Sequence, residues 1–222
     1  MRPALNDEPL SLSEGDTPTW AMWSKLVELS RHLRLDDWLL VGGQMVALHC
    51  HVAGVTPGRA MHLEPQPSLD GRHQHRFRND EMILDVLVPD HTPKHLVLRL
   101  LGRDPVPIVG GARALQRAAY CSVDTVAGLA EIPIPDLRGA LVLKARAWTS
   151  DTRDRDRHLF DLAQLSALID DPLSFGECLD NKELRALRRV DMALAATSDP
   201  WLRIADARRA EAIEAWQTVT AP

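Results

Sequence analysis

The feature that most constrains this chain is a short apolar run that ends in two adjacent glycines. Residues 38–41 are Trp-Leu-Leu-Val, a continuous apolar segment of the kind that forms a buried strand. Gly42 and Gly43 follow, and residues 44–52 place Met, Val and Leu at helical spacing. The sequence therefore predicts a strand, a tight turn and a helix in direct succession, which requires a fold that combines strands with helices.

The Gly42-Gly43 turn also suggests a chemical role. Two residues without Cβ atoms let the backbone approach a phosphate closely. The helix that begins at Gln44 would present free N–H groups and the positive end of its dipole to the same anion. The spacing alone leaves open an alternative, a strand-to-helix turn that holds no ligand.

The rest of the chain divides into three parts. Residues 1–16 are polar, contain prolines and show no periodicity, so a flexible leader is expected. Residues 17–134 are expected to form an α+β core in which helices flank a small mixed sheet. From residue 135 onward the pattern is helical, which predicts a C-terminal helical region over 135–222.

The expected elements follow from local pattern and turn residues. The predicted helices span residues 18–34, 44–52, 112–118, 137–148, 155–169, 182–195 and 204–219. The predicted strands are 38–41, a hairpin of 73–78 with 82–88, and then 96–101, 106–109 and 120–126. Residues 54–72 are rich in Gly and Pro and are expected to form a long loop, and Ile132-Pro133 is expected to lead into the next helix.

Composition and charge argue against several classes of protein. The formal net charge of −5 provides no global basic field for nucleic acid, although a local basic patch is compatible with it. Cys50, Cys121 and Cys178 are an odd number without close spacing, which argues for a reducing compartment rather than a disulfide framework. The N-terminus lacks the apolar region of a signal peptide, and no apolar run approaches 18 residues. A cytoplasmic protein without a membrane span is expected.

Two groups of charged residues are further candidates. Asp85 stands in the otherwise apolar segment Ile-Leu-Asp-Val-Leu, so its carboxylate must meet a cation, a hydrogen-bond donor or solvent. Lys144 and Arg146 lie near the end of one predicted helix, and Asp161 lies on the next, where Lys144 and Asp161 are expected to face each other. These cations would suit a triphosphate. A solvated sheet face for Asp85 and a solvated, charge-alternating turn for the others are the alternatives.

Three other segments carry weaker signals. His49-Cys50-His51 lacks metal-ligand spacing, because adjacent helical residues point in different directions. The basic residues of 72–76 fit an exposed strand edge, and Gly110-Gly111 fits a turn. The sequence contains no Walker loop and no CxxC pair.

Taken in order, these segments resemble one family. The apolar run with Gly-Gly is followed by "ILDVLVPD", "VGGARALQRA", "GALVLKARAW" and "RDRHLFDLAQL". This order over roughly residues 18–180 resembles bacterial nucleotidyltransferase-like proteins related to the abortive-infection (type IV toxin–antitoxin) nucleotidyltransferases of the polymerase-β-type superfamily.

The resemblance implies both a mechanism and a set of site residues. Gly42, Gly43 and Gln44 would hold nucleotide phosphates, together with Lys144, Arg146 and Asp161. Asp85 would be a catalytic carboxylate that binds Mg²⁺ with a D-x-D pair on an earlier strand. The implied partners are an NTP, an RNA or protein acceptor, and a cognate antitoxin.

One part of the family pattern is missing. The D-x-D pair is expected after the segment that begins at Gly58, but Met61 to Gly71 contains no D-x-D, and Asp70 and Glu64 are the only acids there. Since one carboxylate cannot hold two metal ions, two hypotheses follow. The chain is either a Mg²⁺-dependent nucleotidyltransferase or a catalytically degenerate binding protein of the same fold. An unrelated helical regulator is a lesser third hypothesis.

Overall fold

The computed structural model describes residues 3–12, 17–55, 76–78, 83–85, 87–93, 104–152 and 154–221. The strands are β1 Leu10–Ser11, β2 Arg76–Arg78, β3 Ile83–Asp85, β4 Leu87–Pro89, β5 Val106–Ile108, β6 Ala118–Thr125 and β7 Gly128–Pro135. The helices are α1 Thr17–Ser30, α2 Gly43–Val52, α3 Gly111–Gln116, α4 Leu137–Ser150, α5 Asp156–Ser166, α6 Pro172–Glu177, α7 Asn181–Arg188 and α8 Asp206–Thr220, with 3-10 turns η1 Leu35–Asp37 and η3 Asp199–Arg203.

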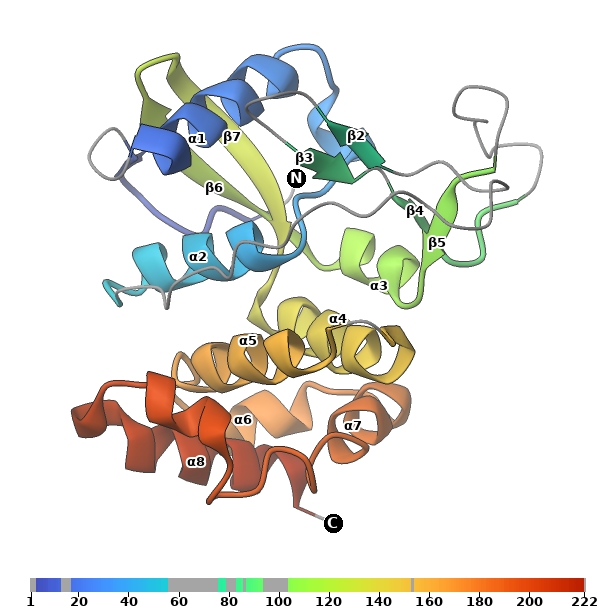
Figure 1. Ribbon diagram of the computed structural model, residues 1–222, viewed down its shortest axis with the longest axis vertical. Helices are drawn as coiled ribbons and strands as arrows, with labels where there is room; N and C mark the ends of the chain where they lie inside the picture. Colours follow the sequence, from blue (N-terminus) through green and yellow to red (C-terminus); the bar gives the residue numbers. More distant parts are fainter. Residues whose placement is uncertain are drawn as a thin grey trace.

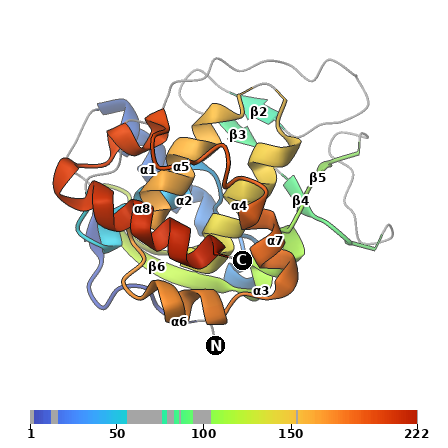
Figure 2. The same cartoon turned by 90° about the horizontal axis from the view of Figure 1, so that it is seen from below.

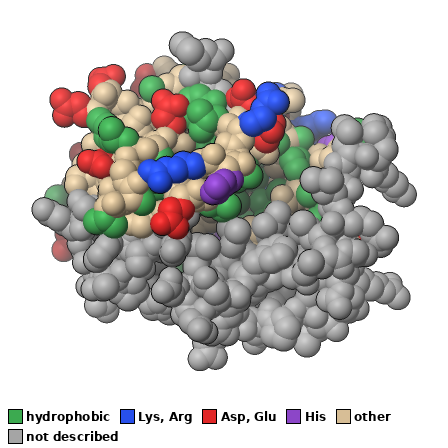
Figure 3. Space-filling view, turned by 90° about the horizontal axis from the view of Figure 1, so that it is seen from above, with side chains coloured by type: hydrophobic (Ala, Val, Ile, Leu, Met, Phe, Trp, Pro, Cys, Tyr) green, Lys and Arg blue, Asp and Glu red, His purple; other side chains and the backbone are tan. Residues whose placement is uncertain are grey.

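The elements form two layers (Figure 1). The strands and α1–α3 make the upper layer, and α4–α8 gather below it, as the view from below also shows (Figure 2). The predicted α+β class with a small sheet is therefore confirmed. Acidic and basic side chains are interspersed over the described part of the upper face (Figure 3), and no described helix is long and apolar enough to cross a bilayer.

Strands β6 and β7 form a hairpin. Strand β6 is the central strand of the three-stranded sheet, whose order is β1-β6-β7. The two strands pair antiparallel over their full length, from Ala118 opposite Pro135 to Thr125 opposite Gly128. Alternate residues point inward, so Cys121, Val123 and Ile132 are fully buried. Strand β6 was predicted as residues 120–126. Strand β7 was not predicted, and Ile132-Pro133 lies within it rather than leading into a helix.

Residues 3–12 lie along β6 and are not the loose leader that the sequence suggested. Strand β1 pairs parallel with β6, and Leu5 N–H donates to the Tyr120 carbonyl at 2.8 Å. The Asn6 side chain bonds both the N–H and the carbonyl of Ser122, at 3.0 and 2.9 Å. Leu12 is buried in the core. The segment was missed because most of its bonds are made by the backbone, which polar composition does not reveal.

Residues 38–41 do not form the predicted strand. They lie beside β7, where Leu40 N–H donates to the Pro133 carbonyl at 2.8 Å, but no ladder follows. Pro133 has no N–H to return that bond, and Pro135 lacks one as well, so the edge of β7 cannot support a regular strand there. The predicted helix that follows the two glycines is confirmed as α2.

The remaining strands form two short pairs. Strands β2 and β3 are antiparallel, as the predicted hairpin requires. Strands β4 and β5 are parallel, with Leu87 opposite Val106. The predicted strand at 96–101, and all of the predicted loop at 54–72 beyond Val55, lie outside the described residues.

The helices of the lower layer follow the predicted pattern closely. Helix α4 begins at Asp136, whose carboxylate accepts from Gly139 N–H at 2.7 Å. Leu162 and Leu165 of α5, with Trp216 of α8, are completely or almost completely buried. Helices were predicted over α4, α5, α7 and α8, whereas α6 was not predicted. These buried apolar side chains form the part of the hydrophobic core that lies in the lower layer.

A buried carboxylate links the two layers. Glu183 of α7 is 1% exposed, and its oxygens accept from Arg117 at 3.0 Å and Arg113 at 3.3 Å. It also accepts from Asp180 N–H at 2.9 Å, which completes a capping box at the start of α7. The two arginines belong to the α3 segment that precedes β6, so Glu183 connects α7 to the upper layer.

Replacing Glu183 with Ala should destabilise the protein by about 3 to 5 kcal/mol, because the half-buried Arg117 guanidinium would lose its closest carboxylate partner. Urea unfolding followed by circular dichroism measures this change. Asp37→Ala is the control, since it removes only an exposed pair with Arg34 and should cost within about 1 kcal/mol. Equal effects of the two substitutions would contradict the assigned role.

Candidate functional site

Helix α2 begins at the two glycines. Gly42 precedes the helix with φ +90° and ψ −156°, and among the described residues no side chain caps its first turn. A Cβ atom built on Gly42 or Gly43 would meet nothing within 4 Å. Met45 and Val46 are buried and fix the helix to the core. The first backbone N–H groups of α2 are therefore held in place by the buried residues of the helix.

A second Gly-Gly turn, at Gly110 and Gly111, holds an anion from within the chain. Its first glycine has φ +88° and precedes α3. The carboxylate of Asp90 accepts from Gly110 N–H at 2.7 Å and from Ala112 N–H at 3.0 Å. Burial acts to raise the pKa of Asp90, but these two bonds, together with the charges of His91 and Arg146, hold the pKa below its usual value. The turn is therefore occupied by a side chain, whereas no described side chain is bonded to the Gly42-Gly43 turn.

Arg146 belongs to the Asp90 turn. A Cβ atom on Gly110 would lie 2.9 Å from Arg146 Cδ, so a larger residue there would displace the Arg146 side chain. The positive charge of Arg146 is also close enough to lower the pKa of Asp90. Arg146, which was predicted to bind nucleotide together with Lys144, lies beside this internal turn.

Lys144 and Asp161 face each other across the α4–α5 hairpin, which confirms their predicted pairing. The Lys144 ammonium donates to Asp161 Oδ2. Lys144 is 5% exposed, and this burial lowers its pKa, while the charge and hydrogen bond of Asp161 act to raise it. Any phosphate that reaches Lys144 would therefore share the ammonium with Asp161.

Asp151, Arg157 and His158, which lie in the charged segment that the sequence singles out after Lys144 and Arg146, complete this charged cluster. The carboxylate of Asp151 accepts from Arg157 at 3.1 Å and pairs with His158 Nε2 at 3.1 Å. His158 is 5% exposed. Burial is the largest cause that lowers its pKa, followed by the charge of Lys144. His158 precedes Leu162 and Leu165 by four and seven residues, so the sequence itself indicates that it lies on the inward face of the helix.

Helix α2 connects the glycine turn to the charged cluster. Its C-terminal half lies against α5, where burial and the charge of Asp161 raise the pKa of Cys50 to about 11. In the same half, His49 Nε2 lies 2.9 Å from the Pro135 carbonyl, at the entrance to α4. Because Gly43 begins the helix seven residues before Cys50, the open turn and the cluster are separated by about 10 Å along α2.

Asp85 is exposed at the end of β3 and stands opposite Arg76 in the β2–β3 register. Within the described ranges, no group of three or more His, Cys, Asp or Glu side chains is arranged to hold a metal ion. The segment in which a D-x-D pair was sought, 61–71, lies outside the described residues.

Folding stability should depend on the protonation of His158. Its pKa is lower in the folded protein than in the unfolded chain, where it is about 6.5, so the unfolded state binds the extra proton as pH falls. The stability that neutral His158 provides is complete above pH 6.5 and is lost below it. His158→Gln should flatten the fall in unfolding free energy between pH 7 and pH 5, and His32→Gln, at an exposed site, should not. Parallel curves for both variants would contradict this.

Comparison with known proteins identifies no relative. The chain matches no family model, no curated protein and no solved structure. The features on which a function can be argued are therefore the open α2 turn and the buried charges of the α4–α5 hairpin.

Proposed function

We propose that this chain is a nucleotidyltransferase-like protein that binds the phosphates of an NTP at the Gly42-Gly43 turn. The supporting observation is the contrast between the two glycine turns. The Gly110-Gly111 turn binds the carboxylate of Asp90 through backbone N–H groups. The Gly42-Gly43 turn begins a longer helix, and in the described part of the chain no side chain caps its first turn. A phosphate would satisfy the N–H groups of this turn and gain from the helix dipole.

Lys144 and Asp161 form an ion pair between α4 and α5, the two helices against which α2 packs. A lysine held in place by Asp161 keeps a fixed position, so it supports the helix that presents the phosphate site. Gln44, the second residue of α2, is half-buried beside the turn and completes the predicted phosphate-binding set. Arg146 acts indirectly, through the Asp90 turn.

A second candidate function is transfer of a nucleotidyl group from the bound NTP to an RNA or protein acceptor, in a toxin–antitoxin-like system with a cognate antitoxin. It rests on the order of the sequence motifs and on the exposed carboxylate of Asp85. Its rival is a catalytically degenerate binding protein. The absence of a D-x-D pair from residues 61–71 favours that rival.

Gly43→Asp should weaken NTP binding at least about tenfold, because a carboxylate would enter the space before the α2 amides and repel phosphate. Isothermal calorimetry with ATP, GTP, CTP and UTP, each with and without Mg²⁺, measures binding. Ala53→Asp introduces the same charge at the other end of α2 and should leave the affinity unchanged. No saturable binding by the native protein would refute the proposed site. Binding that is indifferent to Mg²⁺ would favour the degenerate protein.

Nucleotidyl transfer should depend on Asp85 if the second candidate is correct. Labelled NTPs are incubated with the protein, Mg²⁺ and either total RNA or total protein, and transfer is measured by label in the acceptor. Asp85→Asn keeps the size of the exposed side chain and should reduce transfer by at least about a hundredfold while preserving the fold. Transfer that is absent, or equal in the variant, would leave binding as the function.

A further inference from the structure

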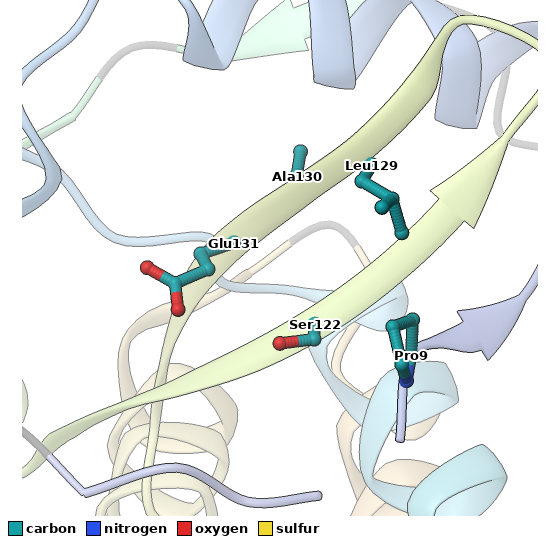
Figure 4. Close-up of a pocket in the computed structure, with 5 residues that line it drawn as sticks. All are labelled: Pro9, Ser122, Leu129, Ala130 and Glu131. Atoms are coloured by element: carbon teal, nitrogen blue, oxygen red, sulfur yellow. The ribbon is translucent and has the colours of Figure 1, made fainter. Parts of the chain in front are cut away.

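The outer face of the three-stranded sheet carries a shallow hollow of about 290 Å³. Its lining spans the three strands and consists of Pro9, Ser122, Leu129, Ala130 and Glu131. Figure 4 shows Pro9 just before β1, Ser122 on β6, and Leu129 and Glu131 on β7 around the hollow, while the side chain of Ala130 points away from them. Helix α1 packs against the sheet from the opposite side (Figure 1), so the described helices leave this face open.

This face combines exposed apolar and acidic side chains. Leu129 is 65% exposed, and Val126, in the β6–β7 turn, is 64% exposed. Glu131 stands opposite Ser122 in the register and Asp124 stands opposite Leu129, so all four side chains share the outer face. Glu131 and Asp124 are both exposed. An apolar hollow with a polar rim is the pattern of an interaction surface.

We propose that this face binds a segment of a partner protein in which one large apolar side chain is flanked by lysine or arginine. The apolar side chain would enter the hollow against Leu129 and Pro9. Its basic neighbours would pair with Glu131 and Asp124 at the rim. Complementary charge fixes the class of partner, and apolar burial supplies most of the affinity.

The same charges disfavour the other occupants. A second copy of this chain would bring Glu131 and Asp124 close to their own counterparts, and like charges at an interface cost affinity. A nucleic acid would place phosphates against the same carboxylates. The proposal does not depend on nucleotide binding, because the hollow lies on the sheet and not at α2.

The test uses the full chain and a short fluorescent peptide in which one leucine is flanked by lysines, with binding followed by fluorescence anisotropy. Leu129→Ser should weaken binding at least about tenfold, because the apolar contact is lost. Glu131→Lys should weaken binding and reduce its dependence on salt. Leu202→Ser, on η3, is the matched control because Leu202 is 66% exposed, and Glu177→Lys on α6 is the matched charge control.

The proposal predicts unchanged binding in both controls and a comparable loss when the peptide leucine is replaced by serine. It is overturned by any of three results. The first is no saturable binding, and the second is an equal loss in the Leu129 and Leu202 variants. The third is a concentration-dependent dimer in sedimentation that Leu129→Ser abolishes, which would make a second copy the occupant.

Discussion

The backbone pairing of β6 with β7 is the constraint on which the rest of the described fold depends. In an antiparallel pair, every second residue turns its N–H and carbonyl away from its partner strand. On β6 those groups belong to Tyr120, Ser122 and Asp124, and each meets a residue of the N-terminal segment. On β7 the Pro133 carbonyl meets Leu40 and so positions the chain that enters α2. The hairpin thus sets the position of the first strand and of the candidate phosphate turn.

Buried charge plays a different part in the lower layer. Lys144 and Asp161 join α4 to α5, and Glu183 joins α7 to the arginines beside α3. Removing water from such groups costs free energy, which only good partners offset. Their value is therefore specificity: each pair is satisfied in one arrangement of the helices. Helix α2 packs against α5 and α4, so this arrangement of the lower layer supports the helix that begins at the glycine turn.

The sequence allowed the helices to be predicted better than the strands, for a physical reason. Apolar spacing in α4 and α5 reports their buried faces directly, and it also placed Lys144 opposite Asp161. Residues 38–41 can form a regular strand only if the neighbouring strand β7 donates N–H groups to them. Pro133 of β7 has no N–H group to donate. Of the candidate site, the open turn and the ion pair were predicted. The positions of Arg146 and Asp90 were not predicted, because both residues lie where α4 contacts the Gly110-Gly111 turn, which is distant from α4 in sequence.

The N-terminal strand has a consequence for how the chain reaches this fold. Asn6 and Ser122 are bonded although 116 residues separate them. Closing so long a loop costs conformational entropy before any contact repays it, so such pairings form late. During synthesis the segment around Asn6 leaves the ribosome before β6 and must wait for the whole of that strand to emerge. Until then, the N-terminal segment has no β6 to pair with, at the stage when association with other chains is most favourable.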